Sequence, residues 1–134
     1  WVGGRSDAAM RRTVRFDAAW HPNRMTPRWL RDTGLPRLRE IADDMGGKMP
    51  ALCPRIQLEI TDKPIEGDDR IFGVGTLEQI HEDFVLLDQL GAEHVILDWY
   101  VHGDPQTDPS DEDGWRQLSL LADQVLDLNN EQVR

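Results

Sequence analysis

The sequence is poor in cysteine and in long apolar runs, and each shortage excludes a class of protein. Cys53 is the single cysteine among the 134 residues, so the chain can form neither an internal disulfide nor a cysteine-based zinc site. We expect this thiol to be a small buried hydrophobic group rather than a nucleophile. No apolar run approaches the roughly 20 residues of a membrane-spanning helix, and the first residues lack the pattern of a signal peptide. These shortages predict a cytoplasmic protein.

Positive charge is also scarce, and most of it lies in the first part of the chain. The 15 Lys and Arg residues face 25 Asp and Glu residues, giving a formal charge of -10, which argues against nucleic-acid or anionic-membrane partners. Up to Arg55 there are 11 basic and 6 acidic residues, or +5, whereas from Ile56 onward there are 4 and 19, or -15. An anionic ligand would therefore bind more readily to the first part.

Short apolar runs alternate with segments of helical periodicity, which is typical of βα units and a parallel sheet. Ser6 and Thr26 are suitable N-caps for two helices, and Pro27 suits a first helical position, where a missing N–H costs nothing. Thr33–Pro36 predicts a break, after which a new helix should run to Met45. The expected strands are 1–2, 18–21, 55–61 and 94–100.

Two later helices are also expected. Thr76 with Gln79 has the pattern of a capping box, and Gly91 predicts the end of that helix. The last helix should follow a loop over 101–114. The acidic run within that loop lacks the spacing of a calcium-binding loop, so we interpret it as a solvated loop and not as a calcium site. The apolar stripes expected in these helices are Leu77, Ile80, Phe84 and Leu87 in the first, and Leu118, Leu121, Ala122 and Val125 in the second.

The two later strands differ in their patterning. In 55–61, apolar and polar residues alternate, which predicts one buried face and one polar face. Glu59, on the polar face, could orient a ligand, but we expect it to pair with a neighbour instead. The almost continuous apolar run around Val95–Leu97 instead predicts a strand buried on both faces. Four βα units in this order could form a small open sheet or half of a (β/α) barrel, of which the chain has about half the length, so we expect one α/β domain over residues 1–134.

The most informative local feature is Gly3-Gly4-Arg5-Ser6, at an expected strand-to-helix turn. Two glycines allow a ligand to approach the backbone, and the first N–H groups of the helix point outward. Ser6 adds a hydroxyl and Arg5 a fixed positive charge, so the turn could hold a phosphate. A plain turn is the alternative, and the segment is not a P-loop, because no Lys follows at the required spacing.

Several landmarks together resemble the C-terminal half of the luciferase-like oxidoreductases, which are flavin- or deazaflavin-dependent TIM-barrel enzymes. The segments that carry the resemblance are 1–9 (WVGGRSDAA), Trp20–Pro22, Thr26–Pro27, Gly75–Thr76 and Gly91–Leu97. The family usually has Asp-Gly before the Trp, where this chain has Ala18-Ala19.

The resemblance implies that the four strands correspond to the fifth to eighth of the barrel. It implies that Gly3, Gly4, Arg5 and Ser6 hold the phosphate of FMN or of a deazaflavin coenzyme, and that Trp20 and His21 line the pocket near it. For Trp20 and His21, the alternative is a tryptophan of the core and a histidine whose hydrogen bonds are made within the protein. NAD(P)H as co-substrate is compatible with the resemblance. No catalytic residue is identified, and no metal-ligand spacing is present among the histidines.

We therefore expect a monooxygenase or reductase segment that transfers hydride to or from a small organic substrate. An upstream half-barrel or a second copy, as a homo-oligomer, would complete the domain. One alternative is a non-catalytic half-barrel that binds flavin or self-associates; another is a barrel that binds a sugar phosphate. Weaker candidates for substrate contact end the last strand: Asp98, Trp99, Tyr100 and His102.

Overall fold

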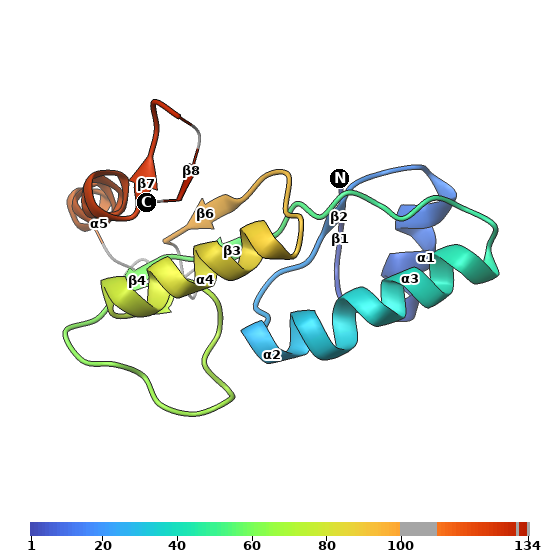
Figure 1. Ribbon diagram of the computed structural model, residues 1–134, viewed down its shortest axis with the longest axis horizontal. Coiled ribbons are helices and arrows are strands. Elements are labelled where there is room, and N and C mark those ends of the chain that lie inside the picture. The colour runs from blue at the N-terminus through green and yellow to red at the C-terminus, as the bar shows by residue number, and fades with distance from the viewer. Residues whose placement is uncertain (100–109, 131, 134) are drawn as a thin grey trace.

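Helices and short parallel strands alternate along most of the chain, giving a mixed α/β fold (Figure 1). The structure, a computed structural model, describes residues 1–99, 110–130 and 132–133. The helices are α1 (Asp7–Arg15), α2 (Pro27–Trp29), the π-helical turn η1 (Leu30–Gly34), α3 (Leu35–Asp44), α4 (Leu77–Gln89) and α5 (Asp111–Gln124). The strands are β1 (Val2–Gly3), β2 (Trp20–His21), β3 (Arg55–Gln57), β4 (Glu59–Ile60), β5 (Val74–Gly75), β6 (Ile96–Asp98), β7 (Leu126–Asp127) and β8 (Gln132–Val133).

Four stretches of the chain lie side by side as parallel strands, in the order in which they occur in the sequence. β1 pairs with β2, and β3 pairs with β6. Parallel bridges from Leu52 to Trp20 and to Ala92, and from Asn23 to Arg55, join these two pairs. β4, which continues from β3, pairs in parallel with β5, while β7 and β8 form an antiparallel hairpin. The strands of the described residues form no closed barrel, and the expected half-barrel stays a prediction.

The long helices follow one another in chain order along the molecule, from α1 and α3 through α4 to α5 (Figure 1). Their apolar sides form the core together with one face of the strands. Ile56 and Leu58 are almost fully buried, at 1% and 0% exposure, whereas Gln57 and Glu59 between and after them are half-buried. The alternation expected for 55–61 is therefore confirmed, although the stretch is divided at Leu58 because β3 and β4 pair with different neighbours.

The opposite side of the strands carries no helix of its own. Register partners share a face, so Arg55 with Ile96, and Gln57 with Asp98, lie on this side. We call it the open face; its residues are Trp1, His21, Arg55, Gln57, Glu59, His94, Ile96 and Asp98. The expected burial of the last strand on both faces is wrong, because Ile96 is 38% exposed on the open face.

The break expected at Thr33–Pro36 is also wrong. α2 passes through η1 into α3 without interruption. Gly34, at the end of the π-helical turn, packs against two indoles: a Cβ there would lie 2.7 Å from Trp29 Cζ3 and 3.1 Å from Trp20 Cη2. The wider turn accommodates the ring and the missing N–H of Pro36, which would disturb a regular α-helix.

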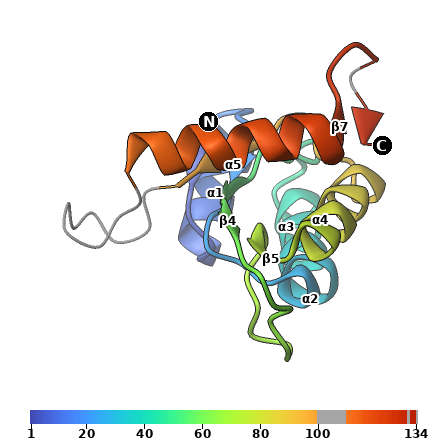
Figure 2. The same ribbon diagram turned by 90° about the vertical axis from the view of Figure 1, so that its left-hand side faces the viewer.

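The last helix begins earlier than expected. Ser110 caps α5 by accepting a hydrogen bond from the N–H of Asp113 at 3.2 Å, so Asp111 and Asp113 belong to the helix and not to a loop. Acidic side chains in a first turn are favoured by the helix dipole. Gln117 then accepts the N–H of Ile60 at 2.7 Å, where α5 crosses beside β4 (Figure 2). The remaining expected loop, with Tyr100 and His102, lies outside the described residues.

Candidate functional site

The chain passes from β1 into α1 through the sharp turn that Gly3 and Gly4 predict. Gly4 has φ +106°, a region that side chains disfavour, and a Cβ there would lie 3.0 Å from the Cβ of Ala9. Ser6 caps α1, its hydroxyl accepting the N–H of Ala9 at 3.3 Å, as its position predicts. The chain therefore turns sharply from the end of a strand into a helix whose first residues are exposed.

The first turn of α1 offers free donors. Asp7 and Ala8 are exposed, and their backbone N–H groups donate to no acceptor within the described residues. These groups lie at the positive end of the helix dipole, where anions are stabilised. The turn can therefore donate hydrogen bonds to an anionic group.

Arg5 lies on the exposed side of this turn and is held by two contacts. Its Nη1 donates to the carbonyl of Arg24 at 2.9 Å, and its guanidinium lies 5.2 Å from the ring centroid of Trp29. These contacts leave other guanidinium N–H groups available, because a guanidinium has five donors. Guanidinium, hydroxyl and backbone N–H groups are the donor set that phosphate prefers, so the residues fit a phosphate group chemically.

One negative charge also lies at the start of α1. Asp7 accepts from Arg37 at 2.5 Å, and this contact holds the pKa of the Asp7 carboxyl below its ordinary value. Arg37, in α3, bonds Glu40 as well at 2.8 Å, and these partners raise its own pKa. Arg37 therefore offsets the charge of Asp7 beside the free N–H groups. No local pattern indicates this role of Arg37, because its partner is 30 positions away in the sequence.

Trp20 lies beneath the turn. Its side chain is 0% exposed and its Nε1 donates to the carbonyl of Gly4 at 2.9 Å. A fully buried indole does not reach solvent, so Trp20 supports the backbone of the turn from inside the core.

His21, next to Trp20, is half-buried on the open face. Its Nδ1 lies 2.6 Å from the carbonyl of Cys53. A carbonyl only accepts, so this contact assigns the proton to Nδ1 and leaves Nε2 as an acceptor in the neutral ring. The ring of Trp1 lies 5.3 Å from that of His21 and 5.8 Å from that of His94. Three rings therefore gather on the open face.

Cys53 is buried, which confirms that its thiol is a small buried group of the interior. Burial raises the pKa of its thiol, and the charge of Glu93 acts in the same direction. The thiolate form is therefore disfavoured, which does not suit a nucleophile.

Polar groups of the open face pair with one another. Gln57 Nε2 donates to Glu59 at 2.8 Å, which confirms the pairing expected for Glu59. Arg55 forms an ion pair with Asp98 on the neighbouring strand. Trp99, the next residue along, is half-buried against Gly114 and lies 6.4 Å, centroid to centroid, from the ring of Trp115. The expected contacts of Asp98 and Trp99 with a substrate stay a prediction.

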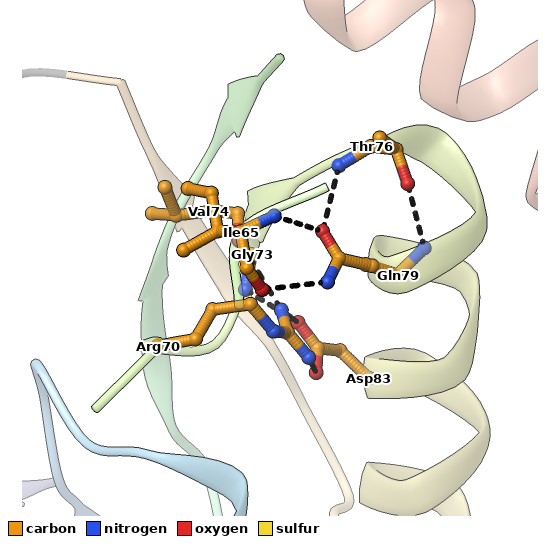
Figure 3. A network of polar contacts seen from close by, with 7 residues as sticks. All are labelled: Ile65, Arg70, Gly73, Val74, Thr76, Gln79 and Asp83. Carbon is orange, nitrogen blue, oxygen red and sulfur yellow. Dashed lines mark hydrogen bonds and ion pairs between the residues drawn. The ribbon is translucent and has the colours of Figure 1, made fainter. Parts of the chain in front are cut away.

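A buried ionic network, not found from the sequence, fixes the segment before α4 (Figure 3). Arg70 donates to both carboxylate oxygens of Asp83, at 2.8 and 2.6 Å, and the side chain of Asp83 is 2% exposed. Asp83 also accepts the N–H of Gly73 at 2.8 Å. An acidic residue beside the apolar stripe of α4 was the one available signal, since a buried carboxylate requires a partner.

The capping box of α4 adjoins this network (Figure 3). Thr76 and Gln79 cap each other as expected, with the Gln79 side chain also bonding the N–H and the carbonyl of Ile65. Figure 3 shows Gln79 and Asp83 extending from one side of α4 toward the segment 65–74. The network therefore has no free donor set comparable to that of the β1–α1 turn, and we interpret it as structural.

The described residues offer neither a metal site nor a membrane-spanning helix. No group of three or more His, Cys, Asp or Glu side chains there is placed to hold a metal ion. None of the helices in that part of the chain has the length and apolarity to cross a membrane.

The chain was also compared with known proteins. No protein-family model matches it, and no curated protein sequence does. The assignment of a function therefore rests on the residues and on their geometry.

Proposed function

We propose that the chain is the C-terminal half-barrel of a luciferase-like oxidoreductase and that it binds FMN or a deazaflavin coenzyme. When bound, the coenzyme supplies hydride transfer to or from a small organic substrate. The protein's own part is to hold the phosphate, orient the coenzyme and exclude water.

The exposed β1–α1 turn is the observation that carries the proposal. The free N–H groups of Asp7 and Ala8, with the guanidinium of Arg5, form a donor set for phosphate at one point of the surface. The turn follows the carboxyl end of a parallel strand, which is where (β/α) enzymes place their sites. Gly3 and Gly4 leave the backbone accessible there.

The arrangement of the strands supports the same proposal. Parallel strands adjacent in chain order, each connected through a helix, are the pattern of a (β/α) barrel. A doubly wound sheet would instead show a reversal of strand order.

The end of the open face that adjoins the β1–α1 turn, at His21, is where the remainder of the coenzyme would lie. His21 contributes an acceptor at Nε2, and the rings of Trp1 and His21 contribute aromatic surface. Trp20 acts indirectly, by holding the carbonyl of Gly4. We assign no proton donor for the reaction.

The test is a titration of the purified chain with FMN and with a deazaflavin coenzyme, followed by quenching of tryptophan fluorescence. Saturable binding of either, weakened by competing inorganic phosphate, is expected. Riboflavin, which lacks the phosphate, is the matched control ligand and should bind more weakly. Equal affinity for FMN and riboflavin would remove the phosphate assignment, and binding of neither coenzyme would overturn the proposal.

A further inference from the structure

Both outer edges of the parallel strands lack a partner strand in the described part of the chain. Val2 and Ile96 donate their N–H groups inward to the neighbouring stretches, each over 2.9 Å. Because alternate residues of a strand direct their N–H groups to opposite sides, Gly3 and Leu97 direct theirs outward. Such edges are templates for pairing with another strand.

Large apolar side chains are exposed near the same two ends. Trp1 and Phe16, beside β1 and α1, are 59% and 67% exposed. Ile96 and Trp115, in β6 and α5, are 38% and 65% exposed. Exposed apolar side chains that cluster in this way are typical of protein–protein interaction sites.

The two end helices carry opposite charges. α1 has three Arg and one Asp, a net charge of +2, and its Arg11, Arg12 and Arg15 are exposed. α5 has four acidic residues and one Arg, a net charge of -3, with Glu112 and Asp123 exposed. The positively charged end of the molecule at α1 is therefore electrostatically complementary to the negatively charged end at α5.

The open face requires a cover for a separate reason. Parallel sheets are covered on both faces in known folds, whereas the described helices cover one. On the open face, Arg55 forms an ion pair with Asp98, and Glu59 accepts a hydrogen bond from the neutral amide of Gln57. Such a face can enter an interior with each of these side chains still hydrogen-bonded.

We propose that a second copy of this chain covers the open face, with β1 and α1 of each copy beside β6 and α5 of the other. A two-fold axis makes the two seams identical, so a single contact satisfies both edges. Four parallel strands then meet four, which is the number at which a (β/α) barrel closes around side chains. The proposal rests on the fold and the charges, and it does not depend on the coenzyme.

Sedimentation equilibrium of the purified chain tests the stoichiometry. We expect a species of twice the 15.4 kDa of one chain, which dissociates more readily at high salt because opposite charges meet at the seams. A chain that stays monomeric at every concentration would overturn the proposal, whatever other protein it binds.

Charge reversal tests the seam itself. The double variant Arg11→Glu/Arg12→Glu should raise the dissociation constant of the dimer about tenfold or more, because like charges then meet. The matched control Arg31→Glu/Arg39→Glu changes the charge equally on η1 and α3, away from the seam, and should leave the constant unchanged. Adding Glu112→Arg/Asp123→Arg to the α1 variant should recover dimerisation. A dimer that responds equally to both double variants would contradict the proposed seam.

Amide hydrogen exchange keeps the test independent of any loss of folding in the variants. The amides of Gly3 and Leu97 should exchange more slowly in the dimer than in the diluted monomer, because strands then pair along both edges. Unchanged exchange at both amides in a dimer would exclude pairing through these edges. Coenzyme titration of the same samples is scored separately, so failure of one proposal is distinguishable from failure of the other.

Discussion

Trp20 donates its indole N–H to the carbonyl of Gly4 at 2.9 Å, so a residue of the core fixes an exposed turn. Trp20→Phe removes this hydrogen bond, which is worth about 0.5–1.5 kcal/mol, and leaves a cavity in addition. We expect a lower free energy of unfolding in urea and a weaker affinity for FMN. Trp115→Phe, at an exposed indole away from the turn, is the matched control and should leave the affinity for FMN unchanged.

Arg5→Ala tests the phosphate site directly. Loss of a charge-assisted contact should weaken coenzyme binding by about 1–3 kcal/mol, while the stability of the fold changes little because Arg5 is exposed. Fluorescence titration gives the affinity and thermal unfolding the stability. Arg39→Ala, an exposed arginine of α3, should bind as the parent chain does. An unchanged dissociation constant for Arg5→Ala would remove this residue from the site.

Asp83→Ala tests the buried ionic network. Removal of one partner from a buried pair leaves the other charge uncompensated, so the free energy of unfolding should fall by about 3–5 kcal/mol. Asp88→Ala changes an exposed carboxylate on the same helix and should cost little. Urea denaturation of the two variants compares them. Equal effects would mean that Arg70 finds another partner or solvent.

Gly73 and Gly67 both adopt a left-handed backbone conformation, but only Gly73 is crowded by other atoms. Both have positive φ, +80° and +98°, so alanine is strained at either by about 1–3 kcal/mol. A Cβ at Gly73 would also lie 1.9 Å from the carbonyl oxygen of Gln57, whereas at Gly67 it would meet nothing within 4 Å. Gly73→Ala should therefore destabilise the chain far more than Gly67→Ala in urea denaturation. Similar losses would show that the 73–74 segment shifts to make room.

The ion pair of Asp7 with Arg37 predicts a dependence of stability on pH. The hydrogen bond from Arg37 holds the pKa of Asp7 below its ordinary value of 3.8. The contribution is therefore present above that value and is lost as the pH falls through the lowered pKa. The difference in denaturation midpoint between the parent chain and Asp7→Asn should be constant near neutral pH and should disappear in acid. A difference that persists in acid would assign the effect to packing.

Helix caps and turns could be predicted from short sequence patterns, whereas contacts between residues far apart in the sequence could not. Ser6, Thr26 and Thr76 act within three residues of themselves, so their caps could be found from the sequence. The Arg70–Asp83 pair spans 13 positions and exists because the segment before α4 folds back. Of the candidate site, the turn was predictable from Gly3 to Ser6. For Trp20 the sequence allows either a core position or a place lining the pocket, because it does not show which indoles face solvent.

Two further differences have tertiary causes. The continuity of η1 with α3 depends on Gly34 fitting against Trp29 and Trp20, which no local rule anticipates. The exposure of Ile96 depends on the open face carrying no helix, whereas its apolar run predicts burial on both faces.

The chain-order arrangement of the parallel strands has a consequence for the route of folding. Each strand of the order meets the strand contributed by the next βα unit, so every pairing joins residues that are far apart in the sequence, as Val2 with Trp20 and Leu52 with Ala92. Parallel pairing of this kind is slow compared with local contacts, since the loop entropy of a whole βα unit is lost before each pairing forms. The outer edges of β1 and β6 therefore stay exposed to other chains while the units are added one after another.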